Sequence, residues 1–108
     1  MQRQHNKLVR DRIPEIIQAA GGQCEVRAIS EEEYLQALRC KLIEEAQEVV
    51  TASSSDLVLE LADLFEVIDV LLEAHNIQRS AVIEMQEARR LERGGFQERV
   101  FLLWSERA

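Results

Sequence analysis

The sequence contains few residues that interrupt helices or cross-link a chain. One proline and four glycines occur among 108 residues, so long stretches are free to form helices. The two cysteines, Cys24 and Cys40, lack the spacing of a metal-binding pair, and we expect them to be reduced, packed thiols. This shortage of cysteine excludes a disulfide framework and a cysteine-based metal site.

Long apolar runs and an excess of positive charge are also missing. No apolar run approaches the roughly 20 residues that span a bilayer, and residues 1–7 carry no signal-peptide core. Twenty acidic and 13 basic residues give a formal net charge of −7, which argues against general binding of nucleic acid. We therefore expect a cytoplasmic protein with neither a membrane nor a nucleic acid as its partner.

The residues that are present indicate one small globular domain over residues 1–108. The composition is 46% hydrophobic and 31% charged, which is typical of a folded chain. Asp11, Ser30 and Ser80 are candidate helix caps, and Ser30 forms a capping-box pattern with Glu33. With the glycine pairs as stop signals, the pattern predicts four helices, over residues 12–20, 31–52, 56–75 and 81–93.

The predicted fold class is therefore mostly α, a four-helix bundle with a central antiparallel hairpin. The serine run at 53–55 is expected to turn the second helix back on the third. Residues 24–29 alternate in polarity and residues 100–104 are apolar, so these two segments could pair as a small two-stranded β-ribbon.

Four acids lie at mirror positions around this turn. Glu48 and Glu60 are equidistant from Ser54, and so are Glu45 and Asp63. An antiparallel hairpin would make the two acid pairs face each other. Convergent carboxylates of this kind form cages for hard cations.

The third helix is apolar over more than half of its circumference. The pattern assigns its core side to Leu57, Leu61, Leu64, Phe65, Ile68, Leu71 and Leu72. Glu66, Asp69 and Glu73 cluster on the remaining, solvated face, whereas Glu60 and Asp63 project from within the apolar arc. Burying a carboxylate without a partner is costly, and Lys41 is the one obvious nearby cation in these helices. A bound Mg²⁺ would relieve the repulsion and could neutralise phosphate charge.

Four short motifs of the sequence resemble those of a known family. Lys41-Leu-Ile-Glu-Glu-Ala-Gln-Glu48, followed by Glu60-Leu-Ala-Asp63, is similar to the ExxE…ExxD signature of the MazG-like, all-α nucleoside triphosphate pyrophosphohydrolases. Lys7-Leu-Val-Arg-Asp-Arg-Ile-Pro14 and Arg93-Gly-Gly-Phe96 resemble the flanking motifs of a small MazG-related subgroup of house-cleaning phosphohydrolases. The resemblance covers about residues 7–104, and the ordered set of motifs is more specific than ExxE alone.

The resemblance implies a reaction and a set of site residues. The reaction is Mg²⁺-dependent cleavage of a nucleoside triphosphate between its α- and β-phosphates, with Mn²⁺ as a substitute metal, in a homodimer or homotetramer. By position, the implied metal ligands are Glu45, Glu48, Glu60 and Asp63. Glu44 or one of these acids, with Glu45 as the candidate, would orient the attacking water.

A triphosphate also needs cations beyond the metal. Basic residues gather near both ends of the chain, and with Lys41 they are the candidate phosphate-binding residues: Lys7, Arg10, Arg12, Arg89 and Arg93. Tyr34, Phe96 and Trp104 are aromatic residues that could stack on a base, but we expect them to pack within the protein instead.

Two other functions remain open from the sequence. Phosphoribosyl-ATP pyrophosphohydrolases share the acid pattern, but they usually carry an aromatic residue and a histidine soon after the aspartate. Here Leu64, Phe65 and Glu66 follow Asp63, and the RGGF ending is foreign to that family. The second alternative is a non-catalytic, nucleotide-binding regulatory module that dimerises through the broad apolar arc of the third helix.

Overall fold

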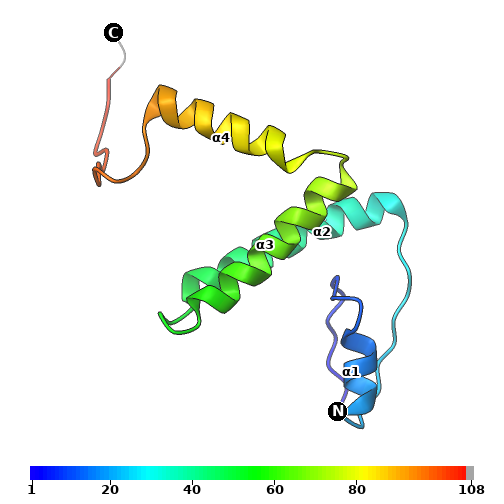
Figure 1. Cartoon of the computed structure of the whole chain (residues 1–108). Helices are drawn as coiled ribbons and strands as arrows, with labels where there is room; N and C mark the ends of the chain where they lie inside the picture. Colours follow the sequence, from blue (N-terminus) through cyan, green and yellow to red (C-terminus); the bar gives the residue numbers. More distant parts are fainter. Residues whose placement is uncertain (107–108) are drawn as a thin grey trace. The chain divides into compact units, whose positions relative to one another are not determined.

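The computed structural model describes residues 1–106 and contains helices joined by irregular segments, with no strand in that range (Figure 1). Its helices are α1 (Ile13–Ala19), α2 (Glu31–Thr51), α3 (Leu57–Ala74) and α4 (Arg79–Arg93). The prediction of a mostly helical chain with four helices is confirmed. Within the described residues, no helix combines the length and the apolar character that crossing a membrane would require.

The chain divides into two compact units. The first unit, Met1–Asn76, holds α1, α2 and α3, and the second, from Ile77 onward, holds α4 and the segment that follows it. The prediction of a single domain over residues 1–108 stays a prediction.

The predicted β-ribbon is wrong for the described part of the chain. Residues 24–29 and 100–104 both have irregular backbone, and the side chains of residues 100–104 are exposed. An isolated pair of short strands is marginally stable in water unless another element covers one of its faces.

The helix ends follow the sequence signals only in part. Ser30 and Glu33 form the expected capping box, in which the Glu33 backbone N–H donates to Ser30 Oγ at 3.2 Å. Asp11 and Ser80 are not caps, because α1 is preceded by Arg12 and α4 by Gln78, neither of which makes a side-chain cap hydrogen bond.

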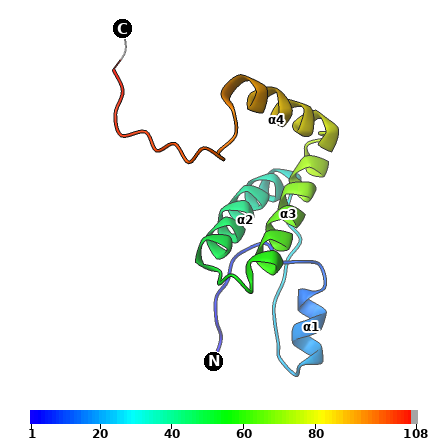
Figure 2. The ribbon, with the colours of Figure 1, turned by 60° about the vertical axis from the view of Figure 1, so that its left-hand side comes forward.

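Helices α2 and α3 form the predicted antiparallel hairpin and lie side by side (Figures 1 and 2). The serine turn between them is held by its own side chains. Ser53 Oγ donates to Asp56 Oδ2 at 3.2 Å, and the Asp56 backbone N–H donates to the Ser53 carbonyl at 3.1 Å. These two bonds join the first and last residues of the turn that connects α2 to α3.

The face of α3 that points inward differs from the predicted one. Leu38 of α2 and Val67 of α3 are the buried hydrophobic residues of the described chain, at 2% and 8% exposure. Phe65 was assigned to the core side but is 53% exposed. The periodicity of the sequence could not identify the buried side of α3, because this helix is apolar over more than half of its surface.

A second apolar face of α3 is left uncovered in the described chain. Leu57, Phe65 and Ile68 are 39%, 53% and 36% exposed, and Val58 is 79% exposed. At about 100° per residue, these four side chains fall within roughly a third of the helix circumference. We call them the outer apolar face of α3.

Other side chains that were expected to pack are also exposed. Cys24 and Cys40 are free thiols at the surface. Phe96 is 95% exposed and Trp104 is 76% exposed. The expectation that these residues pack within the described chain was therefore wrong.

Candidate metal centre

Three carboxylates from the two hairpin helices converge at one place. Glu45 of α2 and Glu60 and Asp63 of α3 each offer an oxygen, and these atoms lie within 4.8 Å of one another. All three residues are half-buried. Glu48, the fourth predicted ligand, is exposed and lies outside this group.

The helix geometry explains why these acids meet. Glu60 and Asp63 are three residues apart, so they share a face of α3 with the buried Val67. Glu45 lies beside the α2 stripe that contains Leu38, and the serine turn brings this stripe against α3. The mirror relation in the sequence thus predicted a real convergence of Glu45, Glu60 and Asp63.

Glu60 has the least favourable environment of the three carboxylates. Loss of solvent raises its pKa, and the negative charges of Glu48, Asp63, Glu45 and Asp56 raise it further. Glu60 makes no ion pair with any residue of the described range 1–106. The site therefore holds more negative charge than its own cations neutralise.

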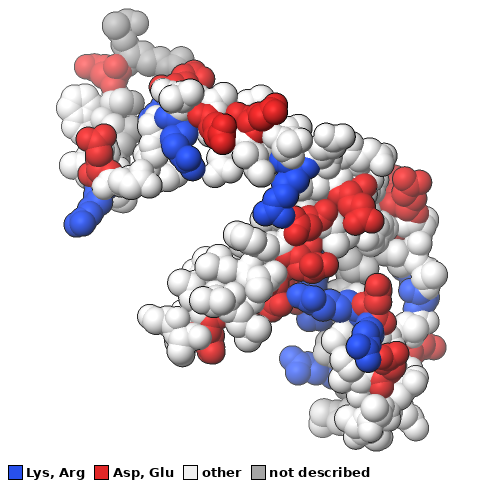
Figure 3. Space-filling view, viewed as in Figure 1, with Lys and Arg blue, Asp and Glu red and all other residues white. Residues whose placement is uncertain are grey.

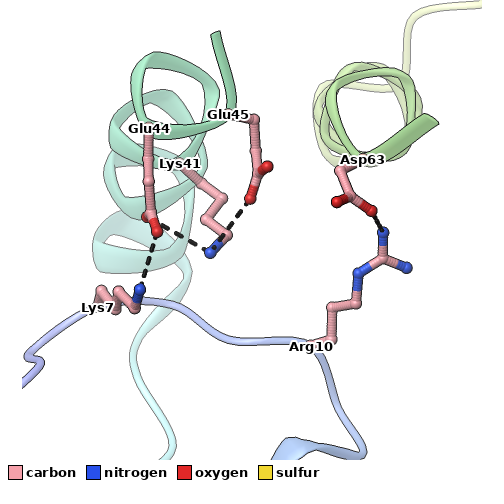
Figure 4. Close-up of polar contacts among 6 residues, drawn as sticks. All are labelled: Lys7, Arg10, Lys41, Glu44, Glu45 and Asp63. Atoms are coloured by element: carbon pink, nitrogen blue, oxygen red, sulfur yellow. Dashed lines mark hydrogen bonds and ion pairs between the residues drawn. The ribbon is translucent and has the colours of Figure 1, made fainter. Parts of the chain in front are cut away.

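The N-terminal segment supplies a cation to each hairpin helix, as Figure 4 shows. Arg10 Nη2 lies 2.8 Å from Asp63 Oδ1, and Lys7 Nζ lies 2.8 Å from Glu44 Oε1. The segment KLVRDRIP, which the sequence placed near the substrate, thus lies beside the acids of both α2 and α3. Acidic and basic side chains are interleaved over this part of the surface (Figure 3).

Lys41 is the cation within the hairpin itself. Its Nζ lies 3.4 Å from Glu44 Oε2 and 3.5 Å from Glu45 Oε1, and its side chain is 15% exposed (Figure 4). The hydrogen bond from Lys7 lowers the pKa of Glu44, and the charges of Lys41 and Lys7 lower it further. Glu44 is therefore held as a charged carboxylate beside Glu45, with which it shares Lys41.

The other predicted phosphate-binding residues are one residue of the first unit, Arg12, and two residues of the second unit, Arg89 and Arg93. Arg12 pairs with Glu15 at 2.7 Å on its own helix and contacts none of the acids above. Arg89 and Arg93 belong to α4 in the second unit, where they line a cavity of about 850 Å³ with Phe96. Within the first unit, the structure brings Lys7, Arg10 and Lys41 to the acids.

Sequence reasoning missed the carboxylate partners of Lys7 and Arg10. The feature that could have indicated these partners is the separation of Lys7 and Arg10 along the chain. Three residues of extended chain cover roughly 10 Å. That span is close to the roughly 8–10 Å between the axes of packed helices. One basic side chain can therefore reach α2 while the other reaches α3.

No family model matches the chain, and no solved structure matches it. An uncharacterized protein of Mycolicibacterium smegmatis is 48% identical over 54 residues, which cover 50% of this chain and 55% of that protein. The matched region is thus about half the length of that curated relative, and the similarity does not show a family for the whole chain.

Proposed function

We propose that this protein is a Mg²⁺-dependent nucleotide pyrophosphohydrolase of the MazG-like superfamily. It would cleave a standard or modified nucleoside triphosphate between the α- and β-phosphates, giving a monophosphate and pyrophosphate. The observation that carries the proposal is the convergence of Glu45, Glu60 and Asp63 within 4.8 Å on two packed helices. The ordered motifs of the sequence support the same reaction.

The donor set fits the proposed metal. It consists of carboxylate oxygens, the ligands that Mg²⁺ prefers and that Mn²⁺ also accepts. Glu60 lies among like charges and lacks a basic partner in the described chain, so a divalent cation would relieve its repulsion. Glu45, Glu60 and Asp63 would hold the ion, and Glu48, one turn along α2 from Glu45, remains the predicted fourth ligand.

The chemistry divides among the neighbouring residues. When bound, Mg²⁺ would neutralise phosphate charge and make a water a better nucleophile. Glu44, held charged by Lys7 and Lys41, is suited to orienting that water, and Glu45 is the candidate to accept its proton. The water oxygen would form a new bond to phosphorus while the α–β bridging bond breaks. Pyrophosphate would leave with the bonding electron pair.

Lys7 and Arg10 are the proposed phosphate-binding residues at this site. Both already lie beside the acids, and both side chains remain accessible, at 42% and 58% exposure. They could therefore exchange a carboxylate for a phosphate oxygen with little movement of the backbone. Lys41 would also bind phosphate oxygens at this site. The phosphate-binding roles of Arg12, Arg89 and Arg93 stay predictions.

We further propose that the protein assembles as a homodimer or homotetramer. The outer apolar face of α3 supports this, because four large apolar side chains are exposed together on one helix. A second copy of the same helix offers a matching apolar surface. The same observation also fits the alternative of a non-catalytic dimerisation module.

Product analysis separates these functions. The purified protein is incubated with a panel of standard and modified nucleoside triphosphates, with Mg²⁺ or with EDTA. Monophosphate and pyrophosphate should appear in equal amounts in the samples with Mg²⁺ and should not appear in the samples with EDTA. Folded protein that turns over no nucleotide of the panel would favour the regulatory module, and release of diphosphate and inorganic phosphate would refute the proposed bond.

A further inference from the structure

The N-terminal segment of the first unit crosses the hairpin on the side to which the acids point. Lys7 Nζ donates to Glu44 of α2 at 2.8 Å. Arg10 Nη2 donates to Asp63 of α3, also at 2.8 Å. Figure 4 shows both carboxylates pointing toward this segment, which thus joins the two helices through their acids. We call residues 7–10 the N-terminal strap.

The middle of the strap differs in its environment from the basic side chains at its two ends. Leu8 and Val9 are half-buried, whereas Lys7 and Arg10 are exposed. Apolar side chains that are partly removed from water favour keeping the backbone where it is. The two basic side chains can therefore change partners while the backbone between them stays in place.

The two ion pairs of the strap are weak enough to be exchanged. The four side chains that form them are each about a third or more exposed, so water screens their attraction. Ammonium and guanidinium groups bind phosphate oxygens with the same charge-assisted hydrogen bonds that they make to carboxylates. A polyanion can therefore compete with the acids for the cations of the strap.

The strap also occupies an oxygen that belongs to the converging acids. Asp63 is one of the three carboxylates that could hold a metal ion, and Arg10 already bonds to its Oδ1. A divalent cation and Arg10 thus compete for Asp63. A ligand that draws Arg10 away leaves Asp63 free, and a cation that takes Asp63 leaves Arg10 free. Two ligands that each remove one partner of the same ion pair favour each other's binding.

We propose that the N-terminal strap couples polyanion binding to divalent-cation binding. In the free protein its cations hold Glu44 and Asp63 in ion pairs. A polyanion that takes Lys7 and Arg10 opens these acids to the metal, and a bound metal raises the affinity for the polyanion in return. The choice of phosphate as the anion and of Mg²⁺ as the metal rests on the proposed function.

Titration calorimetry with inorganic tripolyphosphate in EDTA tests the competition between the acids and the anion. Asp63→Asn removes the charged partner of Arg10 and should tighten tripolyphosphate binding by up to about fivefold. Glu44→Gln, on the other helix, should act in the same direction through Lys7. Arg10→Gln should instead weaken tripolyphosphate binding.

The matched control is Glu66→Gln. It removes the same charge from α3 at an exposed position that takes no part in the ion pairs of the strap. Its affinity for tripolyphosphate should stay within about twofold of the wild type. Equal tightening in Asp63→Asn and Glu66→Gln would reveal a general effect of charge and overturn the strap, as would unchanged affinity in both Asp63→Asn and Glu44→Gln.

Mn²⁺ titration tests the coupling itself. The anionic probe is sulfate, and the reference is chloride at the same ionic strength, so that screening is equal in the two buffers. The wild type should bind Mn²⁺ up to about fivefold more tightly in sulfate, whereas Arg10→Gln should bind it equally in both buffers. A wild type that gains nothing from sulfate would overturn the coupling.

These measurements separate the strap from the hydrolase proposal. Mn²⁺ binding that is lost in Asp63→Asn, but is equal in sulfate and chloride for the wild type, would remove the coupling and leave the metal site standing. The expected changes in tripolyphosphate and Mn²⁺ affinity, without hydrolysis of any nucleotide, would support the strap and remove the proposed reaction.

Discussion

Arg10 donates from Nη2 to Oδ1 of Asp63 at 2.8 Å, across 53 positions of sequence. The guanidinium therefore occupies one side of a carboxylate that the proposed metal would also need. A divalent cation and Arg10 would compete for Asp63 unless the cation binds only its other oxygen. Arg10, a cation of the protein itself, would then take part in the binding equilibrium of the proposed metal.

Replacing Arg10 should consequently strengthen metal binding in the absence of nucleotide. An exposed ion pair is worth about 0.2–1 kcal/mol, so Arg10→Gln should tighten Mn²⁺ binding by up to about fivefold. Titration calorimetry with Mn²⁺ measures this effect. Arg12→Gln is the matched control, because Arg12 pairs with Glu15 instead. Weaker Mn²⁺ binding in Arg10→Gln would show that the arginine supports the site and does not compete with the metal.

Removing one carboxylate of the centre should abolish most of the hydrolysis. A metal supplies several kcal/mol of charge stabilisation, so Asp63→Asn and Glu45→Gln should each lower kcat/KM by about a hundredfold or more. Pyrophosphate release at saturating Mg²⁺ measures the loss. Glu66→Gln removes an exposed acid from the same helix and should retain wild-type activity. Full activity in Asp63→Asn would refute this site.

The raised pKa of Glu60 gives the stability a definite pH dependence. The folded state binds a proton at Glu60 more readily than the unfolded chain does, so this residue favours folding below its unfolded pKa. That contribution is lost as the pH rises through the folded pKa. Glu60→Gln should therefore resist urea better than the wild type near pH 7 without metal, and the difference should shrink near pH 4.

The measurement is the urea midpoint of both proteins in EDTA at one protein concentration. Glu66→Gln reports the general effect of removing an acid from α3. If Glu60→Gln gained no more stability at neutral pH than this control, like-charge repulsion at Glu60 would not be a cost to the fold.

The outer apolar face of α3 should carry the subunit contact. Phe65→Asp would place a charge in that contact and should weaken self-association by on the order of a hundredfold. Sedimentation over a range of concentrations measures the association. Ala62→Asp, at an exposed position on the solvated side of α3, should leave it unchanged. Equal sedimentation of Phe65→Asp and the wild type would place the contact elsewhere or indicate a monomer.

Local signals in the sequence predicted some features of this fold well. The Ser30–Glu33 capping box and the serine turn each depend on residues within a few positions, and both are present. The convergence of Glu45, Glu60 and Asp63 followed from the same turn, because an antiparallel hairpin fixes which positions face each other.

Features that depend on distant contacts could not be predicted in this way. Val67 and Phe65 are both apolar, and only the packing of α2 shows that Val67 is buried while Phe65 is exposed. The partners of Lys7 and Arg10 lie 37 and 53 residues away, so no local pattern identifies them. The β-ribbon failed for a related reason, because apolar character alone does not supply a covering element.

The small buried core has a consequence for control of the protein in a cell. With only Leu38 and Val67 buried in the described chain, a separated protomer has little apolar surface hidden from water. Under the proposed assembly, folding and association become one equilibrium that depends on abundance. Dilution alone would then unfold the hairpin and separate Glu45 from Glu60 and Asp63. The concentration of the protein would then determine whether the three carboxylates of the site are held together.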